Sequence, residues 1–166
     1  SKMGRRGKFG FFYKGKYYLC HNGLDSYPSG LGARLILELL NADLDKWIKL
    51  LENIKEISED VKPRPEDIKR LERYTDKSRG SCATEDWSCL LSGTRGSFYH
   101  VLHCGYIENV YGVDLECDYT YILALDNREF WAQEHYEPGF DIRVKVDREE
   151  LMRLSNKWLG DENDEA

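Results

Sequence analysis

Two short aromatic runs open the chain, and their pattern predicts a β-hairpin. Residues 9–13 and 17–21 place aromatic or aliphatic side chains at alternate positions, as strands with one buried face do. The short link between them contains Gly15, which adopts the positive φ of a tight turn without strain. A hairpin here would bring residues 5–6, at its start, to face residues 22–25, at its end.

Helical spacing replaces this alternation from Leu31 onward. Apolar residues recur every three or four positions in residues 31–40 and again in residues 44–54, which predicts two amphipathic helices. Ser29 precedes the first of them in the position of an N-cap. Pro65 favours the start of a short third helix, because proline is well suited to the first turn.

The second half of the chain returns to the alternation of strands. Residues 117–125 form the clearest strand pattern, and residues 130–134 and 142–146 follow it after turns. An apolar stripe that begins at Leu151 predicts a last helix, which we expect Gly160 to end.

The order of these elements predicts an α+β fold, because strands and helices are grouped along the chain rather than alternating. We expect a mainly antiparallel sheet with an N-terminal hairpin, packed helices, a later meander of strands and a C-terminal helix. A chain of 166 residues corresponds to one domain, which we place at residues 1–160, with an acidic tail at 161–166. The pattern leaves residues 75–95 without an assignment.

Composition narrows the classes of partner. Hydrophobic residues make up 41% of the chain and charged residues 33%, as in soluble globular proteins. The net charge of −6 argues against general nucleic-acid binding, which needs a basic surface. No apolar run reaches the length of a membrane span, so we expect no membrane partner. Composition does not predict the oligomeric state.

The five cysteines favour a cytoplasmic protein with reduced thiols. Their number is odd, no two have Cys-x-x-Cys spacing, and no secretory signal precedes them. A thiol nucleophile at Cys20 or Cys104 is a lesser hypothesis, because free cysteine is mostly a small buried apolar residue. His100, His103 and Cys104 lack the further ligand that zinc requires, so we expect neither a metal nor another cofactor.

The junction between the hairpin and the first helix, residues 21–32, is the favoured place for a site. It crowds polar side chains and glycines between two well-patterned elements, and amides at a helix N-terminus bind anions. The alternative is an ordinary turn, since the same residue types favour turns. The predicted catalytic residues are Asp25 and Ser26. The predicted ligand-binding residues are Arg5, Arg6, Asn22, Tyr27, Ser29, Gly30 and Gly32.

Two functional hypotheses follow from these patterns. In the first, a soluble intracellular domain binds a small anionic ligand, or acts as a hydrolase, at the junction. In the second, the chain is a non-enzymatic protein–protein interaction module of viral or host-facing type. The second rests on the 11 tyrosines, many of them in predicted strands, because tyrosine is enriched at protein interfaces.

Four stretches resemble a group of small uncharacterised proteins from fungi, viruses and phages. They are residues 4–7, the hairpin around residues 13–18, residues 22–32, and residues 117–127, which resemble a later strand of that group. Proteins of that group open with Met-Gly-Thr-Arg-Gly and carry Asn-His-Phe-Asp-Ser-Tyr-Pro-Ser-Gly-Leu-Gly. Here Arg5 replaces the Thr, and Gly23-Leu24 replaces His-Phe. The resemblance implies no activity and assigns no catalytic residue.

Overall fold

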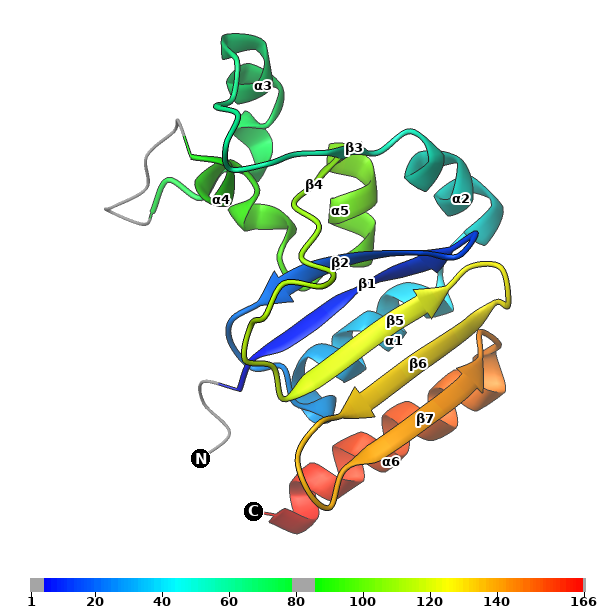
Figure 1. Ribbon diagram of the computed structural model, residues 1–166. Coiled ribbons are helices and arrows are strands. Elements are labelled where there is room, and N and C mark those ends of the chain that lie inside the picture. The colour runs from blue at the N-terminus through cyan, green and yellow to red at the C-terminus, as the bar shows by residue number, and fades with distance from the viewer. Residues whose placement is uncertain (1–4, 79–85, 166) are drawn as a thin grey trace.

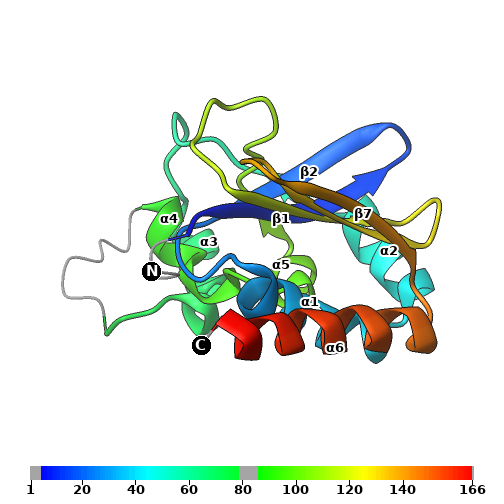
Figure 2. The same ribbon diagram turned by 90° about the horizontal axis from the view of Figure 1, so that it is seen from below.

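A computed structural model describes residues 5–78 and 86–165 of the chain. Within these ranges a five-stranded sheet carries helices on one of its faces (Figures 1 and 2). The strands are, in their order across the sheet, β2 (Lys16–Asn22), β1 (Gly7–Tyr13), β5 (Tyr119–Ala124), β6 (Glu129–Glu134) and β7 (Phe140–Lys145). β1 and β5 pair in parallel, and the other neighbours pair antiparallel. The predicted α+β class with a mainly antiparallel sheet is therefore confirmed.

The predicted hairpin forms over its full length. β1 and β2 are in register from the Gly7–Asn22 pair to the turn, where Lys14 and Gly15 have φ values of 49° and 76°. Two successive positive φ values belong to the tight turn whose twist matches that of paired strands. The aromatic alternation and the glycine therefore predicted this element correctly.

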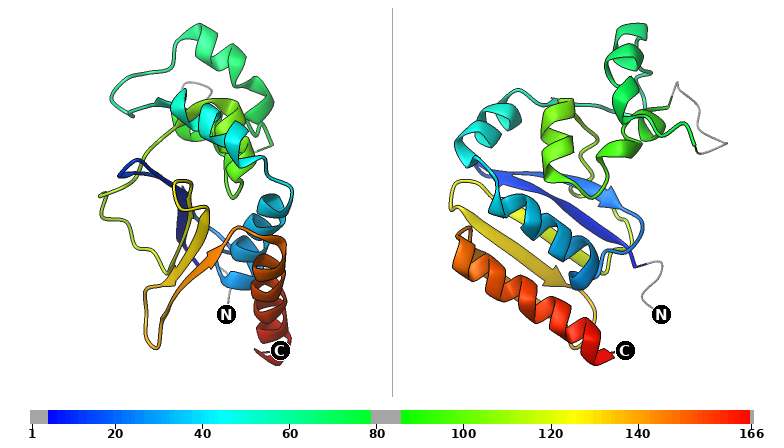
Figure 3. Two further views of the ribbon diagram at one scale, coloured as in Figure 1. Left: turned by 90° about the vertical axis from the view of Figure 1, so that its right-hand side faces the viewer. Right: turned by 180° about the vertical axis from the view of Figure 1, so that it is seen from behind.

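The pleat of the sheet divides its side chains between a covered face and an open face. The covered face packs into the main core with α1 (Ala33–Leu40), α2 (Leu44–Glu52), α5 (Phe98–Cys104) and α6 (Arg148–Glu165). Figures 2 and 3 show α1 and α6 side by side against this face. None of the helices in the described ranges combines the length and hydrophobicity that a membrane span requires.

A smaller helical unit lies beyond the β2 edge of the sheet and has its own core (Figures 1 and 3). Its frame is the parallel pair of β3 (Lys55–Glu56) and β4 (Tyr106–Ile107). The remaining elements of this unit are α3 (Pro65–Arg70), η2 (Glu72–Tyr74), α4 (Trp87–Leu90) and η3 (Ser92–Thr94). The described part of residues 75–95, which the pattern left open, thus includes two short helical turns.

Two sequence predictions need correction. The last helix does not end at Gly160, because this glycine keeps a helical conformation and α6 continues to Glu165. Cys20, Cys104 and Cys117 are free thiols, but Cys89 forms a disulfide bond. The prediction of reduced thiols is therefore wrong at Cys89, and Cys82 lies outside the described residues.

Candidate functional site

The start of β1 and the end of β2 meet at the junction, as the hairpin predicted. The amide of Ser26 donates to the carbonyl of Arg5 at 3.3 Å, which places Arg5 beside the turn. The guanidinium of Arg6 instead lies 3.8 Å from the carboxylate of Glu116. Of the two predicted arginines, Arg5 is therefore the one held against the junction.

Asn22 and Ser26 form a buried hydrogen-bonded pair inside the junction. Asn22 Nδ2 donates to Ser26 Oγ at 2.8 Å and to the Leu24 carbonyl at 2.7 Å. The Ser26 hydroxyl donates to the Asn22 carbonyl at 3.2 Å, and the Ser26 carbonyl accepts from the Tyr121 hydroxyl at 2.7 Å. Ser26 is 0% exposed. Its bonds and its burial favour a structural role over the predicted catalytic one.

The amides that we expected to hold an anion are used within the turn. η1 (Pro28–Gly32) is a single wide helical turn that leads into α1. Within it, the amides of Gly30 and Gly32 donate to the carbonyl of Tyr27 at 2.9 and 3.4 Å. The structure therefore directs these amides into the turn rather than toward a ligand.

Asp25 and the two glycines set the shape of this turn. Asp25 has a positive φ of 55°, and its carbonyl accepts from the Leu31 amide at 3.0 Å. A Cβ at Gly30 would lie 2.5 Å from that carbonyl, and a Cβ at Gly32 would lie 2.7 Å from Trp158 Cζ3. Close packing thus requires glycine at both positions.

Three of the predicted residues, Arg5, Tyr27 and Ser29, line a cavity of about 330 Å³ between the junction, the sheet and α6. We call this cavity the junction pocket, and its volume lies in the range of small-molecule sites. Its apolar lining comes from Pro28, Phe140, Ile142 and Trp158. Its charged lining comes from Arg5, Glu134, Lys157 and Asp161.

Arg5 and two tyrosines form a polar end of the junction pocket. Tyr119 Oη and Tyr136 Oη are 2.5 Å apart, and the guanidinium carbon of Arg5 lies 4.9 Å from the centre of the Tyr136 ring. Arg5 also lies 3.8 Å from Asp118, and its side chain is 39% exposed. Burial and then the hydrogen bond with Tyr136 raise the pKa of Tyr119. Its phenol therefore stays neutral at pH 7 and can donate a hydrogen bond.

Sequence reasoning found one side of the junction pocket and missed the other. Tyr119, Tyr136 and the residues of α6 reach the pocket through the β1–β5 pairing and through helix packing. No spacing in the sequence connects them with Arg5. The predicted residues outside the pocket lining are Arg6, Asn22, Asp25, Ser26, Gly30 and Gly32.

Within the described ranges, no group of three or more His, Cys, Asp or Glu side chains is arranged to hold a metal ion. The resemblance to small fungal, viral and phage proteins stays a prediction. Comparison with family models, with curated proteins and with solved structures gave no match to this chain.

Proposed function

We propose that the protein binds a small molecule with an apolar body and one anionic group in the junction pocket. The observation that carries this proposal is the position of Arg5 beside two phenols in a cavity with apolar walls. A guanidinium and phenol hydroxyls are suitable donors for a carboxylate. The apolar body would pack against Phe140, Trp158 and their neighbours.

The other charges of the pocket limit the charge of the ligand. Glu134 and Asp161 share the lining with Arg5 and Lys157, so positive and negative side chains are balanced. A second negative charge on the ligand would face these carboxylates, and facing like charges oppose binding. A monoanion such as a carboxylate therefore suits the pocket better than a phosphate dianion.

Binding rather than hydrolysis is the proposal because the two predicted catalytic residues do not reach the pocket. Asp25 and Ser26 lie outside its lining, and Ser26 is fully buried. A hydrolytic nucleophile must lie within reach of both a base and the ligand. Because Ser26 is fully buried outside the pocket lining, its hydroxyl does not reach a ligand in the junction pocket.

The test uses three probes with one phenyl body each: 3-phenylpropionate, its neutral amide, and phenyl phosphate. In NMR titrations of the labelled protein, we expect 3-phenylpropionate to shift the amides of Tyr27, Ser29 and Tyr136, and to bind more tightly than the other two. Arg5→Gln should weaken this binding about fivefold, as for loss of one partly exposed charge pair.

Arg6→Gln is the matched control, because it removes the same charge one residue away from a side chain outside the lining. It should leave the affinity for 3-phenylpropionate unchanged. Equal affinities of wild type and Arg5→Gln, or shifts confined to other parts of the molecule, would reject the proposal.

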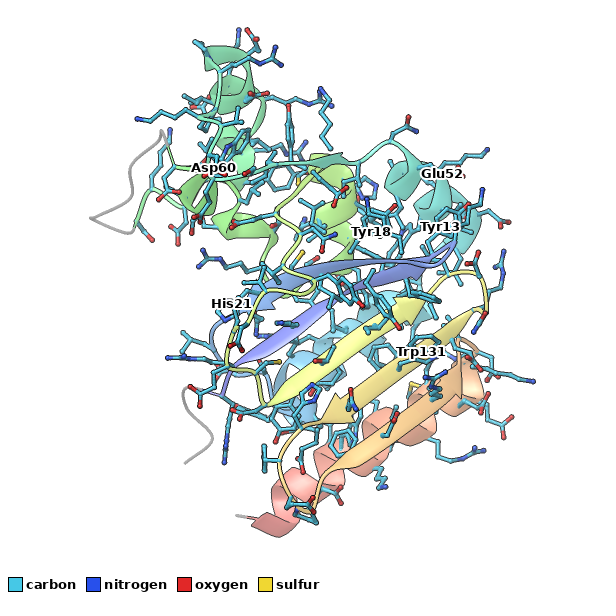
Figure 4. The ribbon with its side chains drawn as sticks, in the orientation of Figure 1. Tyr13, Tyr18, His21, Glu52, Asp60 and Trp131 are labelled. Carbon is cyan, nitrogen blue, oxygen red and sulfur yellow. The ribbon has the colours of Figure 1, made fainter. Side chains whose placement is uncertain are left out.

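A protein–protein interaction module is the second candidate, and the open face of the sheet favours it. An aromatic line on this face consists of Tyr111, Tyr17, Phe12 and Trp131, whose neighbouring ring centres lie 4.8, 4.5 and 5.5 Å apart. The guanidinium carbon of Arg143 lies 4.0 Å from the centre of the Trp131 ring, and Figure 4 shows Trp131 on this face. Aromatic residues and arginine are enriched at protein interfaces.

Self-association provides the test of this second candidate. If the aromatic line is an interface between copies of the chain, Trp131→Glu should convert a dimer to a monomer in sedimentation experiments. The same variant should retain its affinity for 3-phenylpropionate, because Trp131 is not part of the junction pocket. A wild-type protein that stays monomeric at high concentration would remove self-association as the role of this face.

A further inference from the structure

A second cavity, of about 660 Å³, lies between the end of β2 and the smaller helical unit. We call it the strand-edge pocket. Its lining comes from β2, from the segment after β3, from α4, η3 and α5, and from β4 with the segment that follows it. Figure 4 labels His21 near the end of β2, the edge strand nearest the smaller helical unit, in which Asp60 is labelled. The volume is ample for a small molecule.

Hydrogen bonds of Asn109 hold one wall of the strand-edge pocket against β2. Asn109 Nδ2 donates to the Tyr17 carbonyl at 2.9 Å, and its Oδ1 accepts from the Leu19 amide at 3.0 Å. The Val110 amide donates to the Leu19 carbonyl at 2.8 Å. The segment after β4 is thus fixed along the strand edge, and the pocket is formed in advance of any ligand.

Glu59 and Glu108 bring two carboxylates into this pocket from different segments. Glu108 is half-buried, and Glu59 is exposed at its mouth. Burial raises the pKa of Glu108, and the charge of Glu59, a hydrogen bond with the Glu59 side chain and the charge of Asp86 raise it further. Negative charge on Glu59 and Glu108 together is therefore unfavourable unless a positive group lies beside them.

The other titratable residues of the lining offset the two carboxylates only in part. Arg95 donates to Ser88 Oγ at 2.8 Å and to the Ser88 carbonyl at 3.4 Å, and its positive charge lowers the pKa of Glu108 by less than burial raises it. Burial and then the positive charges of Arg95, Arg6 and Lys8 lower the pKa of His21, so its ring is mostly neutral at pH 7. Burial raises the pKa of Cys20, so its thiol stays protonated.

We propose that the strand-edge pocket binds an organic cation, an ammonium or guanidinium group on an apolar body. The cationic group would lie between Glu59 and Glu108, and the body would pack against the apolar lining, which includes Leu91, Ile107 and Val110. A metal ion would need more ligands than these two carboxylates. In the described ranges no third His, Cys, Asp or Glu joins them in a metal-binding arrangement.

The probe is phenethylammonium, with 2-phenylethanol as the neutral molecule of the same body and 3-phenylpropionate as the anion. In NMR titrations of the full chain, phenethylammonium should shift the amides of Ile57, Leu91 and Val110. It should bind more tightly than 2-phenylethanol, and 3-phenylpropionate should leave these three amides unchanged. Equal affinities of phenethylammonium and 2-phenylethanol would overturn the proposal.

Variants with opposite effects separate ligand recognition from a structural role. Glu108→Gln should weaken the binding of phenethylammonium about fivefold. Arg95→Gln should strengthen it, because this variant removes the positive charge that competes with the ligand for the carboxylates. A structural role of Glu108 alone predicts no gain of affinity in Arg95→Gln.

Two further variants complete the experiment. Glu59→Gln tests the same carboxylate pair at an exposed position, where the substitution does not disturb the core if Glu108→Gln fails to fold. Glu116→Gln is the control, because it removes an acidic side chain that is 83% exposed and outside the lining. Unchanged affinity in both Glu59→Gln and Arg95→Gln would overturn the proposal.

Discussion

The junction pocket and the strand-edge pocket both touch the same end of the hairpin, but the junction pocket has balanced charges around Arg5, whereas carboxylates outnumber cations in the strand-edge pocket. Arg5 precedes β1 and lines the junction pocket, whereas His21 near the end of β2 lines the strand-edge pocket. The first pocket sets a guanidinium beside two phenols. The second sets a half-buried carboxylate beside another. One hairpin end therefore separates two environments that should select ligands of opposite charge.

The two pockets also differ in their cores: the main core lines the junction pocket, whereas the strand-edge pocket is lined by the smaller core together with Val101 and Ile107 of the main core. Trp158 and the inward residues of β7 belong to the main core and line the junction pocket. Leu91 and Tyr106 belong to the core of the smaller unit and line the strand-edge pocket. Damage to one core should therefore abolish one kind of ligand binding and spare the other.

Trp158→Ala should have the largest effect, because it removes a buried ring from the main core. Trp158 is 4% exposed, and its ring packs against those of Tyr121, Phe130 and Phe140. We expect the free energy of unfolding to fall by about 3–5 kcal/mol, measured by urea denaturation. The folded protein should lose 3-phenylpropionate binding and keep phenethylammonium binding. Loss of both would show that the pockets are not independent.

Trp87→Ala should reverse this selectivity with a smaller loss of stability. Trp87 is 5% exposed, its Nε1 donates to the Val61 carbonyl at 2.6 Å, and its ring packs near Tyr106. Among the described residues, the Trp87 ring contacts one other aromatic ring and the Trp158 ring contacts three, so we expect a smaller decrease of about 2–4 kcal/mol in the free energy of unfolding. In the same titrations, phenethylammonium binding should be lost and 3-phenylpropionate binding retained. The opposite pattern would contradict the assignment of this core to the strand-edge pocket.

Elements with a continuous local pattern could be predicted from the sequence. The hairpin was predicted from its alternation and its turn glycine. The strand at residues 117–125 and the helical stripe that begins at Leu151 were also clear, because each shows one regular period. The smaller unit was not, because α4 and η3 are too short to show helical periodicity. Gly160 was misread because the acidic residues after it continue the helix.

The sequence predicted only those pocket residues that lie close to one another in the hairpin and the turn after it. Arg5, Tyr27 and Ser29 were found because the hairpin returns the chain to its start. Tyr136 was missed because its approach to Arg5 depends on the parallel β1–β5 pairing, which has no signature at either strand. Glu59 and Glu108 belong to segments that meet only when β3 pairs with β4. Their separation in the sequence therefore does not indicate that they line one pocket.

Ser26→Ala should have a moderate effect and tests whether the junction is structural. The substitution removes one acceptor of Asn22 Nδ2 and a buried hydroxyl. We expect a loss of about 1–2 kcal/mol in the free energy of unfolding, measured by urea denaturation. The affinity for 3-phenylpropionate should not change, because Ser26 is outside the lining. Altered ligand binding at unchanged stability would instead support the direct role that the sequence suggested.

Glu108→Gln should have the smallest effect on stability, and its dependence on pH has a definite sign. The pKa of Glu108 is raised in the folded protein, so folding favours the protonated form. The stability linked to this carboxyl is fully present below its pKa in the unfolded chain and is lost as the pH rises through the folded pKa. Glutamine does not ionise, so Glu108→Gln should be more stable than wild type at pH 7.

The advantage of Glu108→Gln should disappear at about pH 3, where the carboxyl of the unfolded chain is protonated. Because Glu108 is only half-buried, solvent screening limits the gain to a fraction of a kcal/mol. Urea denaturation of both proteins at the two pH values measures it, with Glu116→Gln as the exposed control. A variant less stable than wild type at pH 7 would mean that Glu108 already has a cationic partner within the protein. The strand-edge pocket would then hold no unneutralised carboxylate for an organic cation, and its contrast with the junction pocket would be lost.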